Sequence, residues 1–509
     1  MNKTIQVPLN RVEGDLEIRA ELDDDGRVTK AWCAGTLFRG FERIMLGRGA
    51  LDGLVLTPRI CGICSTAHLT AAALALEHIV GAVVPPDAIR IRNLALMAEH
   101  LQSDLRHTFL MFAVDLVHPR FQTSDLWDEA VQRWAPLRGS TTVEVLRETK
   151  KVLEIIAIVG GQWPHSSFIV PGGIASVPSS GALQQCKHLL RGYRTWYERT
   201  ILGCTIERWQ GVRSHGELAA WLEERPAHRD SELGLLLRHG RKLGLNAAGR
   251  GPGRFLSFGA FDLPPDTKLR VPMGARQLIN PGFVKDNQVH PFEQEHIAEH
   301  LAHSWAGNQA CEHPAQGLTR PYATGAEGEK YSWAKAPRYQ GQVVETGPLA
   351  EAVVAQSPLF IDLLEREGVS VLLRVLARLV RAVELIPAME CWLNEAGKHN
   401  EFYIPPPSLL HGSGYGLTHA ARGALGHWIA IEDSRITHYQ VIPPTTWNAS
   451  PRDNDSVPGA IEQALVGTRV EDPSDPIELG VVVRSFDPCL VCTVHTVNRE
   501  QPLGRIRVG

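Results

Sequence analysis

The chain has 509 residues, of which 44% are hydrophobic and 21% charged, and its formal net charge is −4 with the histidines counted as neutral. A near-neutral chain without clustered lysine and arginine excludes the electrostatic footprint of a nucleic-acid-binding protein. No run of about 18 apolar residues is present, which argues against a membrane span. Residues 1–15 lack the apolar segment of a secretory signal, so we expect a cytoplasmic protein.

The N-terminal part predicts a small antiparallel sheet followed by helices. Residues 4–9, 15–21 and 27–34 alternate apolar and polar positions around turn residues, which is typical of strands. A helical pattern starts at residue 65, and a long helix is predicted from about 87 to 117. Its apolar stripe consists of Leu94, Met97, Leu101, Leu105, Thr108 and Phe112.

The next step of this stripe falls on Asp115. A carboxylate on an apolar face is costly unless it is paired, so Asp115 is a candidate functional residue. The alternative is a capped or solvated helix end.

The remainder of the chain also favours a mainly helical protein. Helices are predicted over 126–160, 180–222 and 358–396, and short strands and loops over 400–486. We see no repeat and no flexible linker. The predicted class is therefore α+β, mainly helical, with a large helical core, small peripheral sheets and one intertwined domain over residues 1–495.

Two cysteine pairs with identical spacing lie at opposite ends of the chain. Cys61 and Cys64 precede a predicted helix, and Cys489 and Cys492 lie in a segment expected to open a helical turn. Four thiolates favour soft metals such as zinc, copper(I), nickel or iron–sulfur clusters. Spacing alone favours a structural zinc site. Three features argue against a structural zinc site. They are the long separation between the pairs, a histidine after each pair, and the turn-forming residues Gly62 and Pro488.

The other five cysteines are scattered singly, and each reads best as a small buried hydrophobic residue. They are Cys33, Cys186, Cys204, Cys311 and Cys391.

The two pairs stand in longer motifs that resemble a known family. RICGICSTAH (59–68) and DPCLVCTVH (487–495) resemble the two signatures of nickel–iron hydrogenase large subunits. RVEGD (11–15), LFRGFE (37–42), ARGALGHW (421–428) and PTTWN (444–448) extend the resemblance over nearly the whole chain. LFRGFE, TPRICGIC and GGQWPHSSFIVPGGI are most similar to the cytoplasmic uptake and hydrogen-sensing branch.

The resemblance implies a Ni–Fe centre whose iron carries two cyanides and one carbon monoxide, Fe(CN)2(CO). Cys61 and Cys489 would be terminal nickel ligands, and Cys64 and Cys492 would bridge nickel and iron. The implied reaction is the reversible heterolytic cleavage of H2 into two protons and two electrons.

The resemblance also assigns the residues that handle protons. The base would be Cys489 or the guanidine of Arg422, although an arginine ordinarily stays protonated. Asp115 and Asp487 resemble acidic partners of Arg422. Glu13 resembles a proton-relay glutamate, and a buried glutamate with a raised pKa suits that task. Without the resemblance, Glu13 would read as an exposed strand carboxylate.

Further residues are assigned to the surroundings of the cofactor. Thr445 resembles the group that hydrogen-bonds a cyanide, and Ala420 and Ala421 belong to the cofactor-binding stretch. His68 is expected to support a bridging thiolate, its alternative being a satisfied helix histidine. The stretch His419 to Arg422 reads His-Ala-Ala-Arg where many relatives have Glu-Ala-Pro-Arg, so the backbone of Arg422 is less constrained.

A distant Mg2+ site is implied by analogy alone, with Glu42, His495 and the carbonyl of Val441 as ligands. Residues 496–509 would be an extension removed on maturation; the alternative is a retained, frayed terminus. A removable extension favours a turnover enzyme over a hydrogen sensor.

The implied partners are an iron–sulfur small subunit, a maturation endopeptidase and nickel-insertion chaperones, with H2 as substrate and an oligomer of heterodimers as the assembly. The competing functions are a regulatory hydrogen sensor with low turnover and a non-enzymatic zinc protein. A respiratory-complex subunit shares the fold but lacks the metal site, and the presence of all four cysteines argues against that relative.

Overall fold

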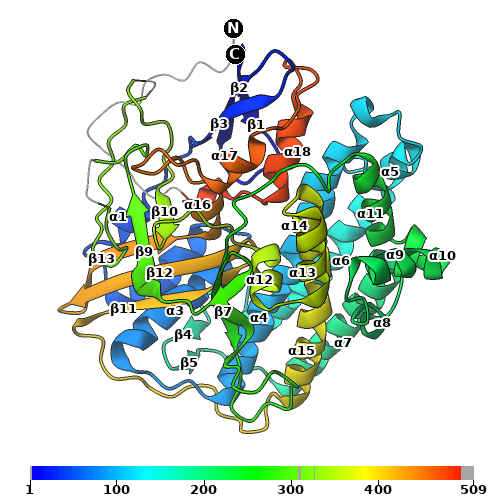
Figure 1. Ribbon diagram of the computed structural model, residues 1–509. Helices are drawn as coiled ribbons and strands as arrows, with labels where there is room; N and C mark the ends of the chain where they lie inside the picture. Colours follow the sequence, from blue (N-terminus) through cyan, green and yellow to red (C-terminus); the bar gives the residue numbers. More distant parts are fainter. Residues whose placement is uncertain (1–2, 308–310, 326, 494–509) are drawn as a thin grey trace.

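The computed structural model describes residues 3–307, 311–325 and 327–493. The chain is mostly helical with several small antiparallel sheets, which confirms the predicted class (Figure 1). In Figure 1 most of the long helices gather on one side and most of the strands on the other. Within these described ranges, no helix is long and apolar enough to cross a membrane.

The central helix of the core is α4 (Pro86–Arg106), which is buried along nearly its whole length. It continues as a π-helical segment, η3 (His107–Phe112), and a 3-10 segment, η4 (Ala113–Val117). The predicted helix over 87–117 is therefore present. Its last third is not α-helical, because residues 107–112 form a π-helix and residues 113–117 a 3-10 helix. All six residues of the predicted apolar stripe are buried.

The other helices of the core pack around α4 and around one another. They are α3 (Ser65–Val80), α5 (Trp127–Trp134), α6 (Ser140–Gly160), α7 (Ser180–Trp196), η6 (Tyr197–Leu202), α8 (Ile206–Trp209), α9 (His215–Glu224), α10 (Pro226–Asp230), α11 (Glu232–Lys242), α12 (Pro348–Val354), α13 (Pro358–Glu367), α14 (Val371–Val380) and α15 (Ala382–Glu395). The helical predictions over 126–160, 180–222 and 358–396 are confirmed, each range being divided into two or more helices.

The predicted N-terminal sheet is confirmed as β1 (Lys3–Leu9), β2 (Leu16–Leu22) and β3 (Val28–Gly35), paired in the order β1-β2-β3. The remaining small sheets use β4 (Ile169–Val170), β5 (Gly173–Ile174), β6 (Phe255–Asp262), β7 (Gln277–Lys285), β8 (Gln288–His290), β9 (Ile297–His300), β10 (Ala336–Tyr339), β11 (Gly412–Ala420), β12 (Gly423–Glu432) and β13 (Arg435–Ile442). Short helical segments α1 (Phe41–Met45), η1 (Ala50–Asp52), α2 (Gly53–Leu56) and η2 (Thr57–Arg59) join β3 to α3.

The C-terminal part departs from the prediction of short strands and loops over 400–486. It contains the three-stranded sheet β11-β12-β13 and the helices α16 (Pro444–Asn448), α17 (Ala460–Leu465) and α18 (Ile477–Ser485). The prediction is wrong for α18, where a run of three valines favours a strand by local propensity. The helix packs against α14 and α17, and this tertiary packing overrides the preference.

The sheet β11-β12-β13 packs closely on α3, the helix that follows Cys61 and Cys64. A Cβ atom at Gly416 would lie 2.0 Å from the carbonyl oxygen of Ala71, so only glycine permits this approach. The hairpin turn between β11 and β12 consists of Ala421 and Arg422, since Ala420 pairs with Gly423. The guanidinium of Arg422 is thereby carried on a two-residue turn.

Candidate metal centre

The four predicted cysteine ligands converge in the structure. Their sulfur atoms all lie within 4.8 Å of one another, and all four side chains are buried. The Sγ–Sγ distances are 3.6 Å for Cys61–Cys489, 3.1 Å for Cys64–Cys492 and 3.1 Å for Cys489–Cys492. None of them forms a disulfide. A buried cluster of free thiols at this spacing fits a thiolate-bound metal centre.

Backbone contacts hold the two cysteine segments in place. Glu13 and Cys489 form a parallel bridge in which the Glu13 N–H donates to the carbonyl of Pro488. Gly14 has a φ of +85°, and a Cβ there would lie 2.9 Å from the backbone nitrogen of Val491, so a side chain is excluded. On the other side, Cys64 ends the loop immediately before α3.

Glu99 of α4 fastens the helix that follows Cys64. Its two carboxylate oxygens accept from the backbone N–H groups of Thr66 and Ala67, at 2.8 and 3.1 Å, which caps the start of α3. Glu99 was not among the predicted site residues, because a glutamate 33 positions from the N–H that it caps leaves no local capping pattern.

The pKa values of three thiols in the cluster depend on burial and on the neighbouring thiols. Hydrogen bonds from the neighbouring thiols hold the pKa of Cys61 well below its ordinary value. Hydrogen bonding to Cys489 raises the pKa of Cys64 well above its ordinary value, and burial does the same for Cys492. A bound metal cation would offset the charge of the deprotonated thiols.

Thr445 lies against the same cluster. Its hydroxyl oxygen accepts from the backbone N–H of Cys489 at 2.9 Å, and the side chain is buried. Because the oxygen is used as an acceptor here, the hydroxyl hydrogen remains free to donate to another group. Thr445 therefore lies beside the thiol cluster, and its place at the cofactor and its cyanide contact stay predictions.

Arg422 is anchored by Asp487. The Nε atom of Arg422 donates to the Asp487 carboxylate at 3.0 Å and to the Asp487 carbonyl at 3.1 Å. Burial by itself would lower the pKa of Arg422, but Asp487 and the thiolates of Cys489, Cys64 and Cys61 raise it well above its ordinary value. Because Arg422 holds its proton more firmly, it is a poorer general base than Cys489, the other candidate that the family resemblance implied.

Two further arginines fix the turn that carries Arg422. The carbonyl of Ala421 accepts from Arg381 Nη2 at 2.8 Å and from Arg378 Nη1 at 3.3 Å. Arg378 also lies 3.1 Å from the second carboxylate oxygen of Asp487. These contacts hold the backbone where many relatives have a proline, so the expected loss of constraint at Ala421 is compensated by side chains.

The predicted pairing of Asp115 with Arg422 is wrong. Asp115 accepts from Arg484 at 2.6 Å through one oxygen and pairs with Arg11 through the other. Both oxygens are thus used by arginines other than Arg422. The apolar stripe indicated a buried, paired carboxylate at Asp115, but a pattern on one helix does not identify the partner.

A network of buried ion pairs that was not predicted from the sequence adjoins this site. It runs from Arg378 through Asp104, Arg381 and Glu351 to His419. Asp104 lies three positions after Leu101 and four before Thr108, which places it beside the apolar stripe of α4. That position was the available signal for a buried carboxylate.

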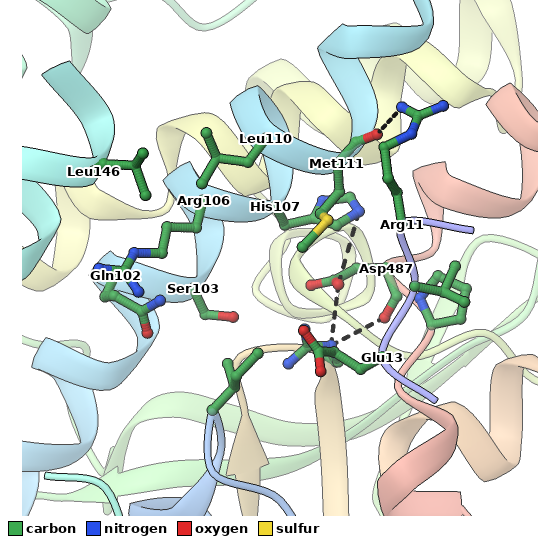
Figure 2. Close-up of a pocket in the computed structure, with 14 residues that line it drawn as sticks. Arg11, Glu13, Gln102, Ser103, Arg106, His107, Leu110, Met111, Leu146 and Asp487 are labelled. Carbon is green, nitrogen blue, oxygen red and sulfur yellow. Dashed lines mark hydrogen bonds and ion pairs between the residues drawn. The ribbon is translucent and has the colours of Figure 1, made fainter. Parts of the chain in front are cut away.

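Glu13 is half-buried beside the cluster. Burial raises the pKa of its carboxyl, the guanidinium of Arg422 opposes this shift, and the charge of Cys61 adds to it. The side chain lines the same cavity as Arg422 and Asp487 (Figure 2).

His68 is fully buried on α3. Its Nδ1 lies 3.0 Å from Nε2 of His427, whereas its Nε2 has no hydrogen-bond partner among the described residues. Burial lowers the pKa of His68 to about 4, so the imidazole is neutral at pH 7. Its predicted support of a bridging thiolate stays a prediction.

Two of the residues predicted to bind Mg2+, Glu42 and Val441, contact each other in the structure. Glu42 accepts from the Val441 N–H at 3.0 Å and from Lys335 at 3.2 Å through the same oxygen, and its other oxygen has no partner in the described part of the chain. Lys335 also pairs with Glu299 at 2.7 Å, so the site already contains one cation. His495 and the extension over 496–509 lie outside the described residues.

The single cysteines do not join the cluster. Cys33 and Cys186 are buried, as predicted, whereas Cys204 and Cys391 are half-buried and Cys311 is exposed. The prediction of a buried residue is therefore wrong for Cys311.

Comparisons with known proteins agree with this geometry. The model of the family "Nickel-dependent hydrogenase" matches residues 39–125 and 242–495. The chain is 31% identical to the periplasmic [NiFeSe] hydrogenase large subunit of Desulfomicrobium baculatum, covering 97% of this chain and 95% of that one. It is 29% identical to the hydrogenase-2 large chain of Escherichia coli (strain K12), covering 97% of each.

A solved structure, the reduced Ni-Fe-Se hydrogenase from D. vulgaris Hildenborough, superposes with a TM-score of 0.81 at 29% identity, covering 97% of this chain and 100% of that chain. These relatives are described as large subunits or large chains, which implies a small-subunit partner. The chain therefore belongs to the nickel-dependent hydrogenase family as a large subunit, and its four-cysteine site is consistent with a Ni–Fe centre.

Proposed function

We propose that the chain is the catalytic subunit of a cytoplasmic uptake hydrogenase that oxidises H2 to two protons and two electrons. The observation that carries this proposal is the buried cluster of four free thiols facing the guanidinium of Arg422. No further metal cluster of cysteine, histidine or carboxylate groups was found among the described residues. We therefore infer that the electrons pass to an iron–sulfur small subunit.

The four thiolates would hold nickel and iron, with Cys61 and Cys489 on nickel and Cys64 and Cys492 between the two metals. When bound, the Ni–Fe centre, with Fe(CN)2(CO), supplies the heterolytic splitting of H2. Soft sulfur donors suit such metals, and burial excludes water from the site.

The protein's own part is to accept and remove protons. Cys489 is the better candidate base, because Asp487 keeps Arg422 protonated. Arg422 then contributes a fixed positive charge beside the cluster. Glu13, tied by its backbone to the Cys489 segment, is placed to receive a proton and return it toward solvent.

The remaining assignments extend this proposal. Thr445, His68, Ala420 and Ala421 would surround the cofactor, and Glu42, Val441 and His495 would bind Mg2+. The free oxygen of Glu42 supports a cation there. We further infer removal of residues 496–509 by a maturation endopeptidase after nickel-insertion chaperones have acted, and an oligomer of heterodimers.

Infrared spectroscopy of the complex purified from its native host tests the central proposal. We expect absorption bands of one carbonyl and two cyanides, with about one nickel and one iron per chain. Fully matured, H2-active protein without these bands, or protein that contains only zinc, would contradict it.

Two measurements test the assignment to uptake. Mass spectrometry should find a chain that ends at His495, and an intact 509-residue active form would contradict the cleavage. Steady-state H2 oxidation with an artificial acceptor should give the turnover of an enzyme; very slow turnover with a retained tail would indicate a hydrogen sensor.

A further inference from the structure

Three buried side chains, His68 of α3, His427 of β12 and Tyr439 of β13, form a row of hydrogen-bonded groups. Nδ1 of His68 lies 3.0 Å from Nε2 of His427, and Nδ1 of His427 lies 2.9 Å from the hydroxyl oxygen of Tyr439. Each of the three residues is at most 2% exposed. The row therefore links the first turn of α3 to the third strand of the sheet that packs on it.

One end of this row belongs to the thiol cluster. His68 lies four positions after Cys64, and side chains on a helix lean toward its N-terminus, which here is the end that carries Cys64. Burial lowers the pKa of His68, while the negative charge of Cys61 acts on the ring in the opposite direction. Because Nδ1 is turned to His427, the nitrogen left for the cluster is Nε2, which has no hydrogen-bond partner among the described residues.

With neutral imidazoles, the hydrogens of the row can be arranged in two ways. In the first, Tyr439 donates to Nδ1 of His427, Nε2–H of His427 donates to Nδ1 of His68, and His68 carries its hydrogen on Nε2. In the second, every donor and acceptor is reversed, and His68 carries its hydrogen on Nδ1. A charged His427 would also donate to Nδ1 of His68 and would leave His68 in the tautomer of the first arrangement.

The Tyr439 end favours the first arrangement. Burial raises the pKa of Tyr439 above its ordinary value, so the hydroxyl keeps its hydrogen. Within the described ranges, Nδ1 of His427 is the one hydrogen-bond partner of this hydroxyl. In the second arrangement the oxygen would accept from His427, and its own O–H would need an additional acceptor. A buried donor without a partner is costly, so the first arrangement is the more stable at this end.

The His68 end favours the same arrangement. In the first arrangement Nε2–H needs an acceptor, and thiolate sulfur atoms are acceptors. In the second arrangement Nε2 would present a lone pair toward negatively charged sulfur and would need an additional donor. The first arrangement therefore uses groups that the chain itself supplies at both ends, whereas the second needs an added partner at each end.

We propose that Tyr439 and His427 are positioning residues, which hold His68 as the Nε2–H tautomer and so make it a hydrogen-bond donor to the thiol cluster. The proposal rests on the proposed function in so far as these thiolates bind nickel and iron. A thiolate that accepts a hydrogen bond gives less electron density to its metal, so the row tunes the metal centre through His68. The family resemblance assigned a role to His68 alone, and it gave none to His427 or Tyr439.

Neutron diffraction from crystals of the purified complex tests the arrangement directly, because it locates hydrogen and deuterium atoms. We expect one on Nε2 of His68, one on Nε2 of His427, and one on the Tyr439 oxygen directed toward His427. A hydrogen on Nδ1 of His68 would overturn the proposal. This result does not depend on the reaction that the complex catalyses.

Infrared spectra of the loaded complex test the effect on the metal centre. Tyr439→Phe keeps the ring but removes the O–H that selects the tautomer. We expect its carbonyl band to move to lower wavenumber or to split, because thiolates that lose a donor pass more charge to iron and its carbonyl. Tyr197→Phe is the matched control, since this equally buried hydroxyl donates to the Leu379 carbonyl at 2.6 Å and lies outside the row. A Tyr439→Phe band at the wild-type position would contradict the proposal.

Two substitutions of His427 separate hydrogen bonding from packing. The amide of His427→Gln can accept from Tyr439 and donate to Nδ1 of His68, so its carbonyl band should stay at the wild-type position. His427→Leu can do neither and should shift the band as Tyr439→Phe does. Equal shifts in the two His427 variants would overturn the proposal, and this pair decides it if Tyr439→Phe does not assemble. A wild-type complex without any carbonyl band would instead contradict the proposed function, while the hydrogen positions would still test the row.

Discussion

Replacing Asp487 by asparagine removes a negative charge from between two buried guanidinium groups and keeps the size of the side chain. One carboxylate oxygen is 3.0 Å from Arg422 Nε, and the other is 3.1 Å from Arg378 Nη1. His107 lies 3.7 Å away as a third neighbour. The variant therefore tests whether this carboxylate holds Arg422 in position.

The expected loss of stability follows from burial. Removing one partner of a buried ion pair costs about 3–5 kcal/mol, because the remaining charge is left uncompensated. For a chain of 509 residues the unfolding entropy is about 1 kcal/mol per kelvin, so the thermal midpoint should fall by about 3–5 °C. Asp472→Asn is the control, since this half-exposed residue lies 3.7 Å from Arg120 and its loss should shift the midpoint by less than about 1 °C.

The pH dependence gives a second check. Burial by itself would raise the pKa of Asp487, but Arg422, His107 and Arg378 lower it below its ordinary value of 3.8. Its contribution to stability is therefore complete above pH 3.8 and is lost as the pH falls through the lowered value. The difference between wild type and Asp487→Asn should shrink only in that acid range.

Scanning calorimetry of both variants, paired with H2 oxidation assays, decides the matter. We expect activity to fall about a hundredfold, because Arg422 loses its anchor and its charge is misplaced. A variant with a wild-type midpoint and more than half of the wild-type activity would refute the assigned role of Asp487.

Three other substitutions test separate parts of the site. Cys489→Ser should abolish H2 activation, while the control Cys391→Ser should leave activity nearly intact, because Cys391 is half-buried and lies outside the cluster. H2 oxidation and metal content are measured for both variants. Equal losses would contradict the ligand assignment. Glu13→Gln should lower turnover and H2/D+ exchange about a hundredfold with unchanged infrared bands, because its proton transfer is lost; unaltered exchange would remove Glu13 from the proton path. Lys335→Met should destabilise the chain by about 3–5 kcal/mol, since Glu42 and Glu299 are left unpaired in the interior; a calorimetric midpoint equal to that of the half-buried control Lys330→Met would argue against this.

The sequence alone determined the ligands and the class of fold. Two C-x-x-C pairs specify four soft donors wherever the chain brings them together, because the chemistry of a thiolate does not depend on the surrounding fold. The helix α4 could be predicted from its periodicity, since a buried apolar stripe repeats at a fixed step along a helix and is therefore a local pattern. The strand pattern of β1, β2 and β3 was local as well.

Tertiary structure alone decided which charges pair. Asp115 joins Arg484 and Arg11, whereas Asp487 takes Arg422 and Arg378, although all of these residues are equally capable of forming ion pairs. Periodicity fixes the face of a side chain on its own helix but says nothing about the helix opposite. Which partner a buried charge meets is set by how segments hundreds of residues apart pack together, and that packing placed Ser103, Arg422 and Arg106 around one cavity.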